Sequence, residues 1–161
     1  MKYTGFDILA GPNVDITGDI HRLSAYFPKN SVDVIFSMSV FEHLAMPWKA
    51  VIEMNRVLKP GGVMFHTSHQ TWPIHEIPWD YWRFSSYSWK SLLNKRTGFE
   101  IIATAMGEEA FLHPKIKHAN LGNIDQCPCF LGSAVTCRKI AETSLEWEVN
   151  VSDIEEDAYP N

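Results

Sequence analysis

The stretch from residue 30 to residue 69 constrains the fold more than any other part of the chain. Residues 32–36 are apolar and rich in β-branched and aromatic side chains, which predicts a strand buried on both faces of a parallel sheet. Apolar side chains then recur at near-helical spacing over residues 47–59, and the Pro-Gly-Gly sequence at 60–62 predicts the end of that helix. Residues 63–65 resume an apolar strand. This order predicts a βαβ unit, and therefore a parallel α/β sheet.

Composition places the chain among ordinary globular proteins. It has 161 residues, 45% hydrophobic and 20% charged, which is enough for a core without disulfide or metal support. It contains neither an apolar run of membrane-spanning length nor a signal-peptide pattern at its start, so we expect no membrane partner. The three cysteines (Cys127, Cys129 and Cys137) are odd in number and lie close together, which predicts reduced thiols and a cytoplasmic location.

Charge is distributed unevenly along the chain. The net charge is −5, and the residues after Ile140 include seven acidic side chains and no lysine or arginine. Residues 1–140 therefore form a nearly neutral body, and residues 141–161 form an acidic tail that we expect to be solvated and partly disordered. A nearly neutral body argues against a nucleic-acid partner, because phosphate binding depends on clustered lysine and arginine.

The residues around the βαβ unit resemble a known family. The sequence FSMSVFEHLAMPWKAVIEMNRVLKPGGVMFHTS, with the D-x-H-x-L segment before it, strongly resembles the second half of a class I S-adenosylmethionine-dependent methyltransferase of the type 11-like group. The resemblance covers residues 3 to about 138. It implies an α/β fold with an incomplete Rossmann-like methyltransferase sheet, mostly parallel with an antiparallel last strand, and makes residues 1–140 an N-terminally truncated methyltransferase-like domain.

Further elements are expected after the βαβ unit. Residues 88–96 have a helical pattern that ends at Thr97-Gly98, and residues 99–105 predict a strand. Residues 107–126 predict a loop or short helix. Residues 130–138 predict the last strand, which in this family inserts antiparallel to the others.

The family's first strand and its glycine-rich turn, D-x-G-x-G-x-G, have no counterpart in this sequence. The chain starts at what resembles the family's second strand. In the family's sheet the first strand lies between the second and the fourth, so its absence leaves two strands with unpaired edges. We expect either that these two strands pair directly or that a second copy completes the sheet as a homodimer.

The resemblance implies S-adenosyl-L-methionine as cofactor, although the missing glycine motif puts its binding in doubt. Asp7, at the end of an expected strand over residues 3–8, would bind both ribose hydroxyls. The alternative is that Asp7 caps the turn before Gly11-Pro12. Asp19 would hold the adenine amine. The other cofactor-binding candidates flank the same pocket: Ile20, His21, Ser37, Met38 and Ser39.

Residues 66–93 combine aromatic and titratable side chains in an unusual density, and Pro73 and Pro78 exclude a regular helix through them. This segment resembles the one that covers the substrate end of the family's cofactor pocket. Aromatic walls with a few polar groups suit a small-molecule site. The alternative is a packed aromatic surface with a structural ion pair between Asp80 and Arg83. The substrate-binding candidates are Trp72, His75, Trp79, Asp80, Tyr81 and Arg83.

Histidines supply the candidates for acid–base chemistry and for metal binding. Methyl transfer needs mainly alignment of donor and acceptor, and His43, His69 or His75 could accept a proton from the acceptor. Three histidines within ten residues (His66, His69 and His75) are also candidate metal ligands. Alternation along a strand, however, places His66 and His69 on opposite faces. We therefore assign no metal ligands. The Cys-Pro-Cys sequence at 127–129 is too short for a metal site, and buried free thiols are expected there.

Three functions follow from these observations. The first is a methyltransferase that uses S-adenosylmethionine on a small-molecule acceptor. The second is a truncated, non-catalytic relative that acts as a binding or assembly subunit. The third is a metal-assisted hydrolase that uses the histidines. The sequence leaves catalytic activity and the identity of the acceptor open.

Overall fold

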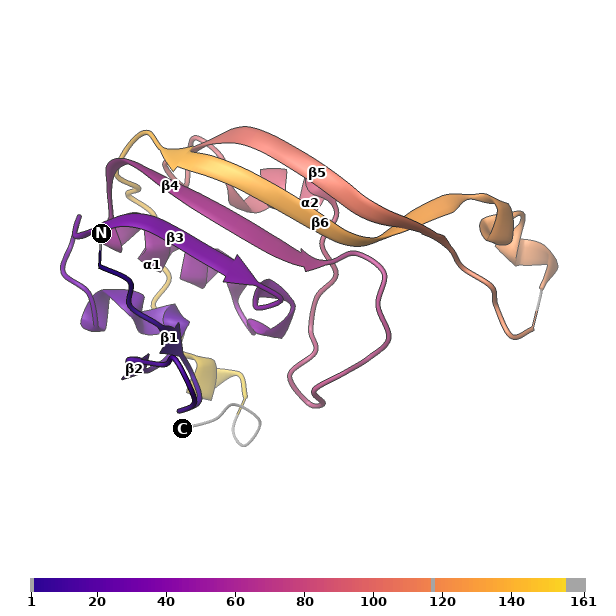
Figure 1. Cartoon of the computed structure of the whole chain (residues 1–161), viewed down its shortest axis with the longest axis horizontal. Coiled ribbons are helices and arrows are strands. Elements are labelled where there is room, and N and C mark those ends of the chain that lie inside the picture. The colour runs from indigo at the N-terminus through magenta and orange to yellow at the C-terminus, as the bar shows by residue number, and fades with distance from the viewer. Residues whose placement is uncertain (1, 117, 156–161) are drawn as a thin grey trace.

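The computed structural model describes residues 2–116 and 118–155. Four strands form the main sheet in the order β3-β4-β6-β5, and two two-residue strands form a separate parallel pair, β1-β2 (Figure 1). The strands and α-helices have these bounds: β1 Phe6–Asp7, β2 Ile16–Thr17, β3 Val32–Met38, α1 Pro47–Val57, β4 Leu58–His69, α2 Ser86–Leu92, β5 Phe99–Phe111 and β6 Pro128–Lys139.

The predicted βαβ unit is confirmed. Strands β3 and β4 pair in parallel and α1 connects them, with Pro47 at the first helical position. The helix ends at Val57, two residues earlier than predicted, because Leu58 already has extended backbone geometry and pairs with Val32. The Pro-Gly-Gly sequence therefore lies inside β4 rather than before it, and Gly61 takes a positive φ of 78° there.

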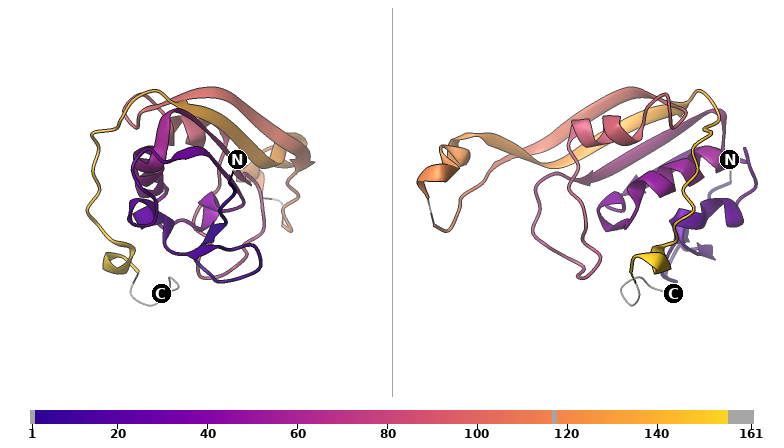
Figure 2. Two further views of the ribbon diagram at one scale, coloured as in Figure 1. Left: turned by 60° about the vertical axis from the view of Figure 1, so that its left-hand side comes forward. Right: turned by 180° about the vertical axis from the view of Figure 1, so that it is seen from behind.

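The antiparallel last strand is also confirmed. Strand β6 lies between β4 and β5 and runs antiparallel to both, so β3, β4 and β5 share one direction. The expectation of a loop over residues 107–126 was wrong for residues 107–111, which continue β5 and pair with β6 down to Phe111↔Pro128. These two strands project from the body as a long arm (Figures 1 and 2). Residues 107–111 lie in this exposed arm and therefore lack the apolar pattern by which a buried strand is predicted.

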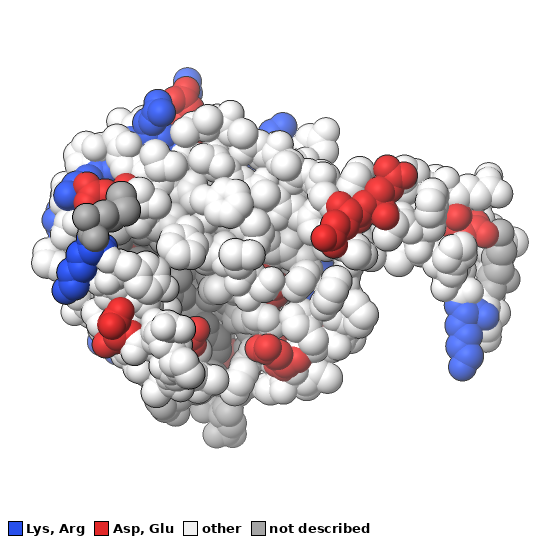
Figure 3. Space-filling view, in the orientation of Figure 1, with Lys and Arg blue, Asp and Glu red and all other residues white. Residues whose placement is uncertain are grey.

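The two sheets are not joined. Within the described residues β1 forms no ladder with β3, so the expected direct pairing of these strands was wrong. Both α-helices lie on one face of the main sheet, as the view from behind shows (Figure 2). The other face exposes Val34, Phe36, Met38 and Phe65, and its centre carries few charged side chains (Figure 3). Within the described residues, no strand pairs with the outer edge of β3, and the apolar face beside it stays exposed.

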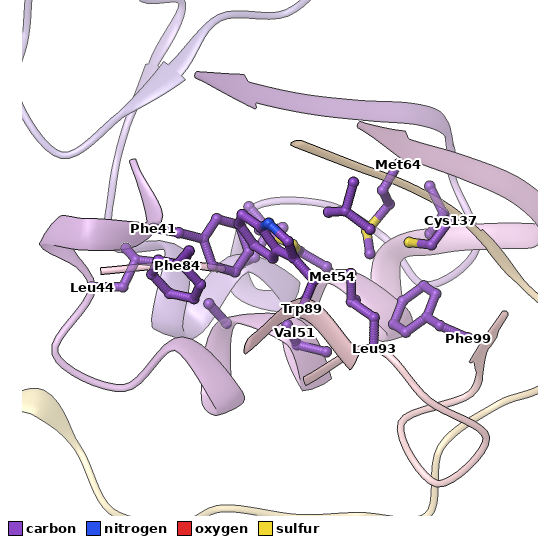
Figure 4. Packing of buried hydrophobic residues seen from close by; sticks show 14 of the residues in the cluster. Phe41, Leu44, Val51, Met54, Met64, Phe84, Trp89, Leu93, Phe99 and Cys137 are labelled. Atoms are coloured by element: carbon purple, nitrogen blue, oxygen red, sulfur yellow. The ribbon is translucent and has the colours of Figure 1, made fainter. Parts of the chain in front are cut away.

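The core lies between the helix-bearing face of the sheet and the two helices (Figure 4). Trp89 of α2 is fully buried at its centre, where it stacks on Phe84 at 4.6 Å between ring centroids and meets the edge of Phe41 at 5.1 Å. Its indole N–H donates to Ser133 Oγ at 2.9 Å, so the one polar atom of the ring is satisfied.

The segment after β6 packs on the body. The backbone carbonyl of Val149 accepts a 2.5 Å hydrogen bond from Lys49 Nζ, and Trp147 contacts Trp48 of α1 at 5.7 Å between ring centroids. Val151 is buried against Met46. Most side chains of residues 141–155 are exposed, as expected of a solvated tail, but these contacts hold the segment on the body, which was not expected. Residues 156–161 lie outside the described residues. Apolar side chains among the acids explain the difference.

The three cysteines are free thiols in different surroundings. Cys127 is exposed, Cys129 is half-buried and Cys137 is buried in the core, where burial raises the pKa of its thiol to about 12. The expectation of buried thiols at 127–129 was thus wrong for Cys127. Among the described helices, none has the length and apolar character needed to cross a membrane.

Candidate functional site

The candidate site lies where the parallel strands β3 and β4 end. Strand β3 ends at Met38, and the 3₁₀ helix η2, Phe41–His43, follows it; β4 ends at His69. Residues 70–85, which we call the covering segment, then pass over this edge without regular structure. Their backbone N–H groups at Tyr81 and Trp82 donate to the carbonyl of Glu42 and so attach the segment to the body. The carboxyl edge of parallel strands is the usual place for ligand sites in α/β sheets.

The three histidines predicted as catalytic candidates meet at this edge. The rings of His43 and His75 lie 4.8 Å apart between centroids, and those of His69 and His75 lie 5.3 Å apart. His43 belongs to η2, His69 lies at the end of β4, and His75 lies in the covering segment. Three segments that are distant in the sequence thus converge on one imidazole cluster.

Glu42 completes this cluster, and the sequence analysis did not select it. Its side chain is fully buried; Oε2 accepts a 2.6 Å hydrogen bond from Ser68 Oγ, and Oε1 lies 3.2 Å from His69 Nε2 without forming an aligned hydrogen bond. A buried carboxylate needs partners, and this one has a free oxygen that faces the histidines. The Glu-His pair of the family motif was the only sequence feature that pointed to it.

His69 is held in place by stacking. Its ring lies on Trp72 at 4.5 Å with an interplanar angle of 12°. Burial lowers the pKa of His69, the cationic forms of its neighbours His75, Arg83 and His43 lower it further, and Glu42 opposes them. At neutral pH His69 is therefore a neutral imidazole that can accept a proton.

Asp80 and Arg83 fix the shape of the covering segment. Arg83 donates to both carboxylate oxygens of Asp80 at 2.5 and 2.8 Å, and also to the backbone carbonyls of Trp72 and Pro73. The hydrogen bonds from Arg83 hold the pKa of Asp80 well below its usual range. Asp80 Oδ2 also accepts from the backbone N–H of His75 at 2.9 Å. The ion pair proposed as a structural alternative therefore exists, and it positions His75.

The remaining substrate candidates are divided by the fold. Trp72 is partly exposed beside His69, whereas Trp79 accepts a hydrogen bond at its backbone carbonyl from His43 Nδ1 at 2.7 Å. Tyr81 packs instead with the cluster around Met46 and Val151. The covering segment thus places Trp72 and His75 at the histidine cluster and directs Tyr81 away from it.

The cofactor candidates Asp7 and Asp19 both take part in local turns. Asp7 Oδ1 accepts from the backbone N–H of Leu9 at 2.9 Å, which agrees with the turn-capping alternative. Asp19 begins the 3₁₀ helix η1, Ile20–Ala25, and its Oδ1 contacts the N–H of His21 at 2.8 Å and His21 Nδ1 at 2.7 Å. Burial acts to raise the pKa of Asp19, but the hydrogen bonds and charge of His21 outweigh it and hold this pKa below its ordinary value.

The turn after β3 contains the other cofactor candidates. Ser37 Oγ lies 2.7 Å from Nδ1 of His66, Met38 is exposed, and Ser39 has a positive φ of 53°. His66 is fully buried against Phe41, on the opposite face of β4 from His69, as the strand alternation predicted. His66 therefore takes no part in the histidine cluster.

Comparison with known proteins points to one family. Residues 7–66 match the family described as methyltransferase domain. This segment is similar to the class I methyltransferases. Curated relatives agree: an uncharacterized methyltransferase of Mycobacterium sp. (strain KMS) is 38% identical over 71 residues, which cover 39% of this chain and 28% of that protein. One of Mycobacterium tuberculosis (strain H37Rv) is 44% identical over 46 residues, covering 29% of this chain and 18% of that protein. The chain thus spans less than a third of these relatives.

Solved structures share the fold of this chain over most of its length. A SAM-dependent methyltransferase from Archaeoglobus fulgidus matches with a TM-score of 0.57 at 14% identity, covering 79% of this chain and 67% of that one. One from Methanosarcina mazei matches with a TM-score of 0.55 at 17% identity, covering 86% and 82%. The [4+2]-cyclase SpnF also matches, with a TM-score of 0.52 at 16% identity, covering 79% and 56%. The same fold therefore serves more than one chemistry.

Proposed function

We propose that this chain acts in S-adenosylmethionine-dependent methyl transfer to a small-molecule acceptor. The observation that carries the proposal is the convergence of His43, His69 and His75 beside Trp72 at the carboxyl edge of β3 and β4. In a methyltransferase family member, an aromatic wall and a neutral imidazole at this edge suit an acceptor that must be oriented and must lose a proton.

Asp7 and Asp19 suit the adenosine half of S-adenosylmethionine. Asp7 ends β1 and Asp19 follows the neighbouring parallel strand β2, and within the described residues no hydrogen bond engages Oδ2 of either carboxylate. Both oxygens are therefore free to accept from ribose hydroxyls and from the adenine amine. The bound cofactor would supply a methyl group activated by its sulfonium. The printed sequence holds no glycine-rich turn for the methionine end, so we expect weak binding.

His69 is the preferred proton acceptor of the three histidines. Its neutral ring is held flat on Trp72, and Glu42 Oε1, 3.2 Å from Nε2, would stabilise the imidazolium that forms when a proton arrives. The Arg83–Asp80 pair fixes the carbonyls of the covering segment around this ring. The chain thus orients an acceptor and takes its proton, which is most of what methyl transfer requires.

Titration with S-adenosylhomocysteine tests the cofactor site. We expect calorimetry to give a Kd of roughly 10 µM to 1 mM, the range left when a few hydrogen bonds to the methionine end are missing. Asp19→Asn keeps an oxygen for the η1 cap but removes the charge, and it should weaken binding about tenfold. Asp33→Asn is the matched control, because Asp33 is an exposed carboxylate paired with Lys59. No binding at several millimolar ligand would refute the proposal.

A non-catalytic assembly role is the second candidate, and the uncovered side of the sheet favours it. Among the residues that the structure describes, none pairs with the outer edge of β3, and Val34, Phe36 and Met38 expose apolar surface beside this edge. Exposed strand edges with apolar faces promote pairing with another chain. We propose that a second copy covers this side, which gives a homodimer.

Light scattering coupled to size exclusion tests the homodimer. We expect the mass of a dimer at about 100 µM protein, and we expect Phe36→Glu to shift it to the monomer because a carboxylate cannot be buried unpaired in an apolar contact. Ile116→Glu, at a similarly exposed apolar position after the end of β5, should leave the dimer intact. A monomeric wild-type chain at this concentration would exclude the homodimer.

A further inference from the structure

We propose that Glu42, His43 and His75 form a binding site for one divalent transition-metal ion. One ligand atom of each residue can be chosen so that all three lie within 4.8 Å of one another. Small side-chain movements would bring them to the separation of about 3.4 Å that ligand atoms have around one tetrahedral ion. This set differs from the one that the sequence raised, because His66 points into the core and Glu42 and His43 take the places of His66 and His69. The site itself does not depend on the proposed methyl transfer.

The hydrogen bonds of the two histidines leave the same ring nitrogen available on each. His43 Nδ1 lies 2.7 Å from the backbone carbonyl of Trp79, and His75 Nδ1 lies 3.2 Å from the carbonyl of Pro73 and 3.4 Å from Asp80 Oδ2. These acceptors require a proton on Nδ1, so Nε2 carries the lone pair in both rings. Metal-binding histidines characteristically hold their second nitrogen in this way, through a carbonyl or a carboxylate.

Glu42 supplies the third ligand and the independent observation that points to a cation. Its carboxylate is fully buried, Ser68 Oγ holds Oε2 at 2.6 Å, and Oε1 has no hydrogen bond among the described residues although His69 Nε2 lies 3.2 Å away. An unpaired buried carboxylate oxygen costs free energy that a bound cation would recover. The structure thus places a buried carboxylate close to two imidazole rings.

The donor set selects the class of metal. Two imidazole nitrogens with one carboxylate oxygen suit zinc and the neighbouring first-row ions, whereas calcium and magnesium prefer sites made of oxygen ligands. Three protein ligands leave a coordination position for water or for an oxygen, nitrogen or sulfur atom of the acceptor. Glu76 Oε2 lies 3.9 Å from His43 Nε2 on an exposed side chain, so it would move aside or join as a further ligand.

Metal titration of the full chain tests the site. After removal of metals with a chelator, we expect calorimetry to show one Zn²⁺ per chain with a Kd below about 10 µM. His75→Ala should weaken binding at least thirtyfold, and because His75 lies on the covering segment outside the core, this variant should fold. His43→Ala should act similarly. His113→Ala is the matched control, since His113 is exposed beyond the end of β5, and it should bind as the wild type does.

Co²⁺ provides a readout that does not rely on heat or on activity. Cobalt bound by nitrogen and carboxylate ligands in a site of low coordination number gives visible absorption that His75→Ala should abolish and His113→Ala should retain. Failure of the wild-type chain to bind about 100 µM Zn²⁺, or equal loss in His113→Ala, would overturn the site. Because S-adenosylhomocysteine binding is measured separately, loss of the metal site leaves the proposed function standing, and the reverse also holds.

Discussion

Replacing Lys139 with methionine should lower the free energy of unfolding by about 2–4 kcal/mol. The ammonium group is buried at 1% exposure and donates to the carbonyls of Asn55 at 2.6 Å and Leu58 at 2.7 Å, and to Asn30 Oδ1 at 2.8 Å. The two carbonyls belong to the end of α1, where the helix leaves acceptors unsatisfied and where a positive charge is favourable. Methionine fills the volume but leaves these acceptors buried without donors.

Urea denaturation of the wild type, Lys139→Met and Lys59→Met tests this expectation. Lys139 Nζ also lies 2.9 Å from Glu142 Oε1. Lys59 is the matched control because its ammonium likewise pairs with a carboxylate, that of Asp33 at 2.7 Å, but both of these side chains are exposed. An exposed pair of this kind contributes less than about 1 kcal/mol. If both variants lost the same free energy, the buried ammonium would not stabilise the end of α1.

The sequence predicted those parts of the fold that depend on local patterns. The apolar run of β3, the spacing of apolar residues in α1 and the Pro-Gly-Gly stop each depend on neighbouring residues, and they were placed within a few positions. The antiparallel insertion of the last strand, β6, followed from the family resemblance. Boundaries failed where tertiary pairing decides them, as in the extension of β5 to Phe111, whose partner lies in β6.

Residues whose role depends on distant partners were not predictable in this way. Glu42 acquires its place through Ser68, 26 positions away, and Lys139 through carbonyls more than 80 positions away. The acidic segment after residue 140 was mistaken for a free end because its net charge indicates only that it is well solvated. Whether it packs on the body depends on single apolar side chains, here Trp147 and Val151. The histidine cluster was foreseen as three separate candidates, since spacing along the chain does not show that loops converge.

His66 should make the stability of the chain depend on pH below neutrality. Complete burial lowers the pKa of this histidine from 6.5 to about 3 in the folded state. As the pH falls below about 6.5, the unfolded chain therefore binds a proton at His66 that the folded chain does not bind. Each further decrease of one pH unit lowers the free energy of unfolding by about 1.4 kcal/mol. Stability linked to His66 is fully present above pH 6.5 and is lost as the pH falls toward 3.

His66→Gln isolates this contribution, because an amide can still pair with Ser37 Oγ, 2.7 Å from Nδ1 in the native chain, but takes no proton. Between pH 6.5 and 4.5 the wild type should lose roughly 2–3 kcal/mol more free energy of unfolding than the variant, as measured by urea denaturation. The variant begins less stable because packing against Phe41 changes, so the slope with pH is the quantity to compare. His113→Gln, at an exposed position, should keep the wild-type slope. Equal slopes in all three proteins would mean that the buried imidazole becomes protonated without unfolding, and that water reaches this part of the core.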